Sequence, residues 1–282
     1  MFESIGRSIA LFRTSWGILM DDKKLLIFPF LSGVAILLLF AIMFVPLFLS
    51  TFLEVTLPIP GGAVFGYALL FVVYLGCYFA VIFFNTALVC CADARLSGRD
   101  LSVREGIAIA FSHLPAILSW ALVSATIGLI LGVLSQRGGI FGKIAAAVAG
   151  FAWNVSTYFV VPVLVFEGKG VSDAIRESVF LIRKTWGESI LGFESVSFVM
   201  SCIIGIAIVG TVILLVLGNS LHLAADFILL ILALGIVSCI ILGVIAVALQ
   251  GIYTTALYQF ARTGNVPAAF SQDQIRNASV RQ

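Results

Sequence analysis

Six long stretches without a charged residue alternate with short polar segments along this chain. Each stretch exceeds the roughly 20 residues that a helix needs to cross the hydrocarbon core of a membrane. We expect helices rather than strands, because an open strand would leave backbone groups unpaired in lipid. The stretches are Leu25–Leu53, Val55–Ala92, Gly106–Gln136, Ile144–Phe166, Ser195–Ala225 and Phe227–Ala261.

Turn-forming residues divide these stretches into three helical hairpins. The segment 57–62 (LPIPGG) interrupts the second stretch, so its spanning helix is expected to begin near Phe65. Gly138-Gly139 and Gly218-Asn219 predict the two other tight connections on the same side. Pro162 predicts a kink in the fourth span. The last stretch is too long for a perpendicular crossing and predicts a tilted or projecting helix.

A short amphipathic segment precedes each hairpin, with apolar residues recurring every three or four positions. Ser102 and Glu105 predict a capping box at the start of the second of these segments. Amphipathic helices with tryptophan and basic residues lie flat in the membrane interface. The expected fold is therefore all-α, a polytopic membrane bundle of six transmembrane helices in three hairpins, each preceded by a cytoplasmic interfacial amphipathic helix. The three segments are 5–19, 103–114 and 171–186.

The three units share short runs of similar residues as well as the amphipathic pattern. Residues 13–17 (RTSWG) are similar to residues 183–187 (RKTWG), which favours an internal repeat. The alternative is that any helical hairpin needs an amphipathic segment before it and a glycine after it. We expect one transmembrane domain, followed by a short cytoplasmic tail in which a helix begins at Ser271. The domain is 1–264, its units are 1–98, 99–170 and 171–264, and the tail is 265–282.

Composition agrees with a membrane protein. Hydrophobic residues make up 61% and charged residues 11%, against roughly 45–50% and 25% in soluble domains. With a net charge of +2, the chain lacks the basic patch of a nucleic-acid-binding protein, so we expect no nucleic-acid partner.

The five cysteines lie in apolar runs without CxxC spacing. We therefore expect neither a disulfide framework nor a metal site. Enzyme motifs are absent, so we expect no enzyme and no cofactor.

Basic residues are distributed unequally between the two sides. Of the sixteen lysines and arginines, fourteen fall in segments on one side, and only Arg137 and Lys143 fall on the other. The positive-inside rule then places both termini in the cytoplasm, as an even number of spans requires. We expect a multi-pass protein of the cytoplasmic (inner) membrane of a prokaryote.

Polar residues inside the spans are the candidates for function, because polar groups are costly in lipid. Most lie on the second helix of each hairpin, and Glu194 lies near the start of the fifth span. They either line a polar pathway or form hydrogen bonds between helices. Glu194 could gate, bind a cation, carry a proton or reach the headgroup level. The other candidates are Asn85, Thr86, Asn154, Thr157, Gln250 and Thr254.

Lys23 and Lys24 directly precede the first span. This basic pair could hold an anion, or it could serve as a topology signal that contacts lipid headgroups. Gly128 and Gly132 form a GxxxG motif, which lets two helix backbones approach closely. The expected partners are membrane lipids. A homo-oligomer is left open, and protein partners are unknown.

Two stretches, Arg13–Phe30 and Val161–Glu188, resemble an uncharacterised prokaryotic family of six-span membrane proteins, a family of unknown function. A fainter resemblance is to the CysZ-type sulfate permeases. It rests on Trp16, on Lys23-Lys24 before an apolar run with an early proline, and on 83–98. That resemblance implies sulfate contacts at Lys23 and Lys24, although the acidic pair at 21–22 departs from the family's pattern.

Two functions fit these observations. The first is a passive channel or permease for a small solute, which could be an anion. The intramembrane polar residues would then line its path. The second is a membrane scaffold or lipid-interacting subunit without transport, which three interfacial helices would also suit. A coupled pump fits less well, because the spans carry no ionisable cluster beyond Glu194.

Overall fold

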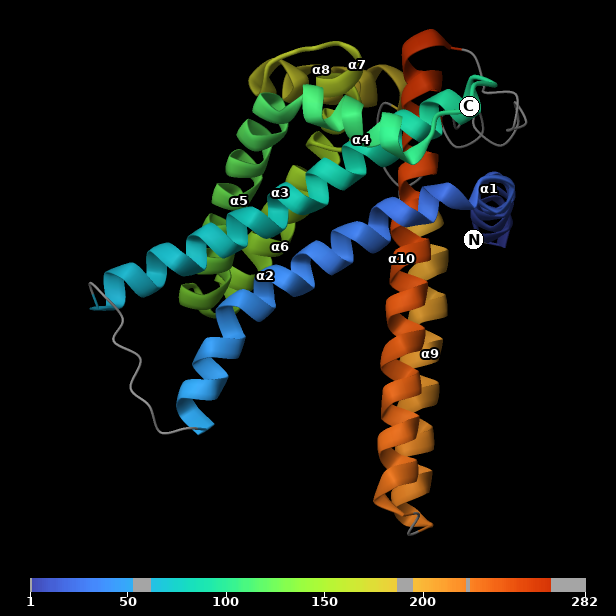
Figure 1. Cartoon of the computed structure of the whole chain (residues 1–282). Coiled ribbons are helices and arrows are strands. Elements are labelled where there is room, and N and C mark those ends of the chain that lie inside the picture. Colours follow the sequence, from blue (N-terminus) through green and yellow to red (C-terminus); the bar gives the residue numbers. More distant parts are fainter. Residues whose placement is uncertain (1, 53–61, 187–194, 222–223, 265–282) are drawn as a thin grey trace.

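The computed structural model describes residues 2–52, 62–186, 195–221 and 224–264, which are helical apart from short connections (Figure 1). No strand occurs within these ranges. The all-α fold expected from the sequence is therefore confirmed. The elements are α1 (Phe2–Asp21), the 3₁₀ turn η1 (Lys23–Leu26), α2 (Ile27–Phe52), α3 (Gly62–Leu96), α4 (Val103–Ser112), α5 (Leu114–Arg137), α6 (Gly139–Ser156), α7 (Val160–Phe166), α8 (Val171–Trp186), α9 (Ser195–Ser220) and α10 (Ala225–Thr263).

Six helical segments are long and apolar enough to cross a membrane, as predicted. They form the expected three hairpins, α2 with α3, α5 with α6 and α7, and α9 with α10. By length and composition the chain is thus a multi-pass membrane protein. The segments are Lys23–Val45, Ala68–Leu96, Leu114–Arg137, Gly139–Phe166, Val196–Ser220 and Ala225–Thr263.

The short helices α1, α4 and α8 lie where the amphipathic pattern places them. The capping box of α4 is confirmed, because Ser102 N–H donates to Glu105 Oε2 at 2.7 Å and Glu105 N–H donates to Ser102 Oγ at 3.3 Å. These bonds satisfy donors that a helix start otherwise leaves free. The hydrogen bonds from Ser102 also lower the pKa of the Glu105 carboxyl.

The packed core lies at one end of the bundle (Figure 1). There the last turns of α1 and α3 meet α7, α8 and the C-terminal part of α10. Leu19, Leu88, Phe159 and Tyr253 are all fully buried in this core. We call this the basic end, because Lys23, Arg95, Lys169 and Arg262 lie around it, whereas Arg137 and Lys143 lie at the far end of α5 and α6.

The hairpin of α9 and α10 extends away from this core (Figure 1). Val196 and Met200 at the start of α9 are buried, whereas most of the large apolar side chains from Ile206 to Val247 are exposed. One internal contact is close, since Thr211 packs directly over Gly235 and leaves no room for a side chain there. The described part of the chain therefore leaves most of this hairpin uncovered.

Two boundary predictions need correction. The connection expected at Gly218-Asn219 lies farther along, because both residues belong to the last turn of α9. A glycine is tolerated in a helix interior, so its presence alone did not mark the end. The fourth span is not one kinked helix over 144–166. It begins at Gly139, and residues 157–159 separate α6 from α7.

Candidate functional site: a broken span in the core

The break in the fourth span occupies the turn before Pro162. Proline has no N–H to donate to the carbonyl of Tyr158, four residues earlier, and its ring crowds that carbonyl. The helix tightens ahead of it, with Tyr158 N–H bonded to the carbonyl of Val155 at 3.2 Å and Val160 N–H bonded to that of Thr157 at 3.0 Å. Irregular backbone at membrane depth is tolerated only inside protein or along a water-filled cavity.

Polar side chains from three other helices form a chain of hydrogen bonds at this break, and one of them bonds its backbone. The buried hydroxyl of Ser178 on α8 accepts a hydrogen bond from Phe159 N–H at 3.1 Å. Gln250 Nε2 on α10 donates to Tyr158 Oη at 3.2 Å, and Ser197 Oγ on α9 donates to Gln250 Oε1 at 2.7 Å. We call these five residues, Tyr158, Phe159, Ser178, Ser197 and Gln250, the break cluster.

Of the two neighbouring residues predicted on α3, Asn85 lies near the break cluster. Asn85 is half-buried, and its Oδ1 lies beside Gly251, the neighbour of Gln250 on α10. Thr86 is 1% exposed, and its hydroxyl has no hydrogen-bond partner among the described residues. The structure therefore brings Asn85 and Gln250 to the same crossing of α3 and α10. Thr254, one turn farther along α10, is half-buried.

The remaining candidates do not converge on this point. Asn154 on α6 is exposed on the outside of the bundle. Thr157 ends α6 and turns its hydroxyl back to the carbonyl of Trp153 at 2.8 Å. Glu194 lies outside the described residues. The polar residues of the three hairpins thus do not form a closed ring, because the second hairpin contributes its backbone break instead of Asn154.

The basic pair lies apart from the break cluster, in and beside η1. Lys24 Nζ is 3.1 Å from both carboxylate oxygens of Asp100, in the connection between α3 and α4. Asp22 caps η1 by accepting from Lys24 N–H at 3.2 Å. Lys23 is exposed. An anion at this point would compete with Asp100 for Lys24.

A second polar group, which we call the ion-pair ring, joins α7, α8 and α10 at the basic end. Glu167 contacts Lys169 Nζ at 2.8 Å and Arg262 Nε at 3.4 Å. Glu177 contacts the same two cations, Lys169 at 2.8 Å and Arg262 at 3.3 Å. Tyr258 Oη donates to Glu167 Oε1 at 2.9 Å. Two carboxylates and two cations therefore alternate, so the ring carries no net charge.

The ring contains a well-buried carboxylate, since the side chain of Glu167 is 8% exposed. Burial favours the neutral acid, but hydrogen bonds from Lys169 and Tyr258 and the charge of Arg262 outweigh it and lower the pKa of Glu167. The hydrogen bonds to Glu167 and Glu177 raise the pKa of Lys169. Both shifts favour the charged forms of Glu167 and Lys169.

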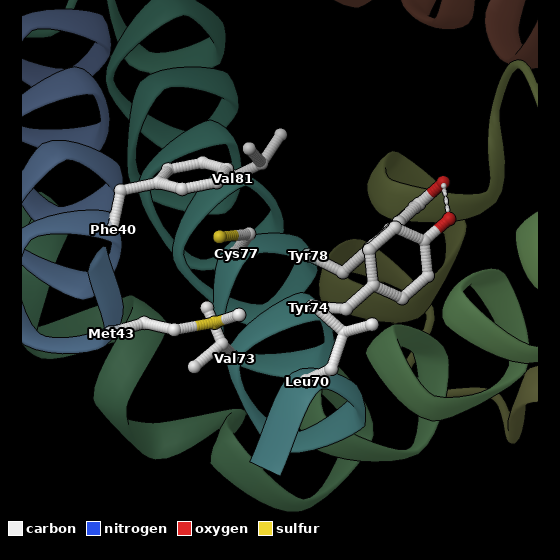
Figure 2. Close-up of a pocket in the computed structure, with 8 residues that line it drawn as sticks. All are labelled: Phe40, Met43, Leu70, Val73, Tyr74, Cys77, Tyr78 and Val81. Atoms are coloured by element: carbon white, nitrogen blue, oxygen red, sulfur yellow. Dashed lines mark hydrogen bonds between the residues drawn. The ribbon is translucent and has the colours of Figure 1, made fainter. Parts of the chain in front are cut away.

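An apolar pocket lies between α2 and α3, apart from the break cluster (Figure 2). Its volume is about 310 Å³, and Phe40 and Met43 of α2 face Val73 and Cys77 of α3 across it. No charged side chain lines it. The pocket suits a hydrocarbon group and not a polar solute.

Two tyrosines border this pocket and also pack against the first glycine of the GxxxG motif. The hydroxyls of Tyr74 and Tyr78 meet at 3.3 Å, on the side away from α2 (Figure 2). They lie against Gly128 of α5, where a side chain would collide with both. Gly132 has open space around it. Gly128 thus serves packing within the chain.

The break cluster consists of an amide, three hydroxyls and backbone groups, without a charged side chain. Such a set can donate and accept hydrogen bonds, as contact with a small polar solute requires. It lies entirely between residues 158 and 250. The chain belongs to DUF6159, a family of unknown function.

The DUF6159 match covers residues 64–268, from near the start of α3 through α10. The break cluster and the ion-pair ring both lie within this region, whereas Lys23 and Lys24 lie outside it. The resemblance to a six-span family of unknown function is thereby confirmed. The fainter resemblance to CysZ-type permeases is not shown, since no curated protein and no solved structure matches the chain.

Of the residues in these two groups, the sequence analysis named only Gln250, and three of those that it missed are instructive. Ser178 falls within an amphipathic helix, where a serine usually faces water, but it is 0% exposed. Glu167 and Lys169 belong to a glycine-rich connection (EGKG) that reads as a simple exit from the span. The available signal was Pro162, because a proline in a spanning helix requires a neighbouring donor or acceptor nearby.

Proposed function

We propose that this protein is a passive permease or channel for a small polar solute, which it binds at the break in the fourth span. One observation carries the proposal, namely the interruption at 157–159 inside the core, where Ser178 accepts from Phe159 N–H and Gln250 donates to the hydroxyl of Tyr158. Discontinuous spanning helices form the substrate sites of many secondary transporters.

The surroundings of the break support this role. Gln250 holds Tyr158 from α10 while Ser178 holds Phe159 from α8. Elsewhere in the core, Thr86 of α3 has a buried hydroxyl without a partner among the described residues. An unsatisfied buried hydroxyl is costly, so a solute or water that reaches it gains a hydrogen bond. The described part of the cluster holds no charge, which favours facilitated passage over ion-coupled pumping.

The proposal includes an orientation. The basic end, with α1, α4 and α8, faces the cytoplasm of a prokaryotic cell, as the distribution of lysine and arginine predicts. The break cluster then lies closer to the cytoplasmic face than to the outer one. Protease or maleimide accessibility at Arg137→Cys, against Arg104→Cys, tests this orientation in intact cells.

The test of transport is solute flux into liposomes that contain the purified protein. We expect sulfate, chloride or an uncharged solute of similar size to enter faster than into empty liposomes. Gln250→Leu reduces this flux, whereas Asn154→Leu, the matched change of an exposed amide on α6, leaves it unchanged. Lys23→Ala with Lys24→Ala reduces flux only if the solute is an anion. Folded, correctly inserted protein without flux of any of these solutes contradicts the proposal.

One observation favours a second candidate, a non-transporting scaffold or lipid-interacting subunit. Both ends of the Gln250 amide are already bonded to protein, as expected of a group that only joins helices. The two functions differ in the accessibility of the break. A cysteine placed at Asn85 reacts with a water-soluble maleimide if a path exists and stays protected if the cluster is sealed.

A further inference from the structure

The outer face of α8 combines basic and aromatic side chains. Arg176, Phe180, Arg183 and Lys184 are all exposed, and their spacing of four, three and one residues places them on one side of the helix. The opposite side is buried in the core through Ala174, Ser178, Leu181 and Ile182. The helix is thus fixed by its inner face and presents a cationic stripe outward.

The stripe contains charges that no described residue neutralises. Arg183 and Lys184 form no ion pair with any described residue. Arg176 is 3.9 Å from Asp173, with both side chains mostly exposed. Phe180 between them is 57% exposed. A large apolar side chain flanked by free cations is unfavourable in water but suits the boundary between headgroups and acyl chains.

The connections of α8 place this stripe at the membrane surface. Phe166, at the end of the fourth span, precedes α8 by only a few residues, and the fifth span begins at Val196. The helix therefore cannot move far from the level where the spans end. Figure 1 shows α8 at the basic end of the bundle, beside the last turns of α10.

The two other short helices repeat the combination. On α4, Arg104 and Phe111 are exposed, and Phe111 has the same 57% exposure as Phe180. On α1, Arg13 and Met20 are exposed two turns apart, while Trp16 between them stacks on Phe12. Arg13 and Arg183, the first residues of the similar segments RTSWG and RKTWG, are thus both exposed on their helices.

From charge complementarity we propose that the cationic stripe of α8, Arg176, Phe180, Arg183 and Lys184, binds the phosphate headgroup of an anionic phospholipid, with Phe180 inserted at the acyl boundary. The stripes of α1 and α4 contribute to the same preference. Near an anionic leaflet each basic residue strengthens binding roughly fivefold, so the loss of Arg183 and Lys184 weakens it roughly thirtyfold. This inference does not depend on transport.

The test uses the full-length protein in a neutral detergent, titrated with phosphatidylglycerol or phosphatidylcholine and analysed by native mass spectrometry. We expect the protein to prefer phosphatidylglycerol, and Arg183→Gln with Lys184→Gln to weaken that binding roughly thirtyfold. The matched control is Arg137→Gln with Lys143→Gln, two cations at the far end, and it keeps most of the preference. Unchanged binding in the α8 variant, or an equal loss in the control, overturns the proposal.

A second measurement locates Phe180 without altering the charges. A nitroxide at Phe180→Cys, in a background without the native cysteines, is expected to collide with oxygen dissolved in the bilayer more often than with a water-soluble nickel complex. The reverse order places the stripe in water. That result would contradict the lipid proposal and favour an acidic protein as the partner of the stripe.

Discussion

Glu167 of the ion-pair ring offers the sharpest test of how the basic end is held together. In Glu167→Gln the side chain keeps nearly the same shape, but Lys169 and Arg262 lose one of their two carboxylates. Breaking a buried ion pair costs roughly 3–5 kcal/mol. The side chains of Lys169 and Arg262 are 34% and 48% exposed, so water screens part of this loss. We therefore expect a decrease of about 2 kcal/mol in the free energy of unfolding.

The measurement is equilibrium unfolding in mixed micelles at neutral pH. Asp173→Asn is the control, because Asp173 forms an exposed pair with Arg176 at 3.9 Å. Its loss should stay within about 0.5 kcal/mol.

The pH dependence adds an independent check. The folded protein lowers the pKa of Glu167 from its ordinary value of 4.5. The charged ring therefore stabilises the protein fully above pH 4.5, and this contribution is lost as the pH falls through the folded-state pKa. Glu167→Gln lacks that contribution, so its stability should decrease less on acidification. If the variant unfolds like the wild type, or loses as much stability in acid, Glu167 does not hold α7 to α10 as inferred.

Two further predictions concern packing inside the bundle. Ser178→Ala removes the acceptor of Phe159 N–H and should lower stability by about 1–3 kcal/mol, whereas Ser172→Ala on the exposed side of α8 should have little effect in the same thermal unfolding assay. Gly128→Ala places a methyl group against two tyrosine hydroxyls and should lower the melting temperature; Gly132→Ala, which meets open space, should not, and equal effects of the two would refute the packing role of Gly128.

The sequence was sufficient for features that depend on local pattern. The six spans follow from uncharged stretches longer than the bilayer requires, and the capping box at Ser102 follows from four consecutive residues. Both are present in the structure. Hydropathy succeeds here because lipid imposes one simple demand on every spanning segment.

Contacts between residues far apart in the chain could not be predicted from the sequence. Ser178 accepts from a backbone group 19 residues away, and Tyr258 reaches Glu167 across 91 residues. No periodicity encodes such distances, because they depend on how the helices cross. For the same reason the amides of Asn154 and Gln250 looked equivalent in their spans, although one is exposed and the other bonds two helices.

The placement of the core at the basic end separates two mechanical roles. The described part of the chain leaves the far halves of α9 and α10 uncovered, so a thinner or thicker bilayer around them would change their tilt at modest energetic cost. The break cluster belongs to the other end, where side chains from α7, α8 and α10 are packed together. Because Ser197 and Gln250 belong to α9 and α10, a tilt of this hairpin would be transmitted to Tyr158 through their hydrogen bonds.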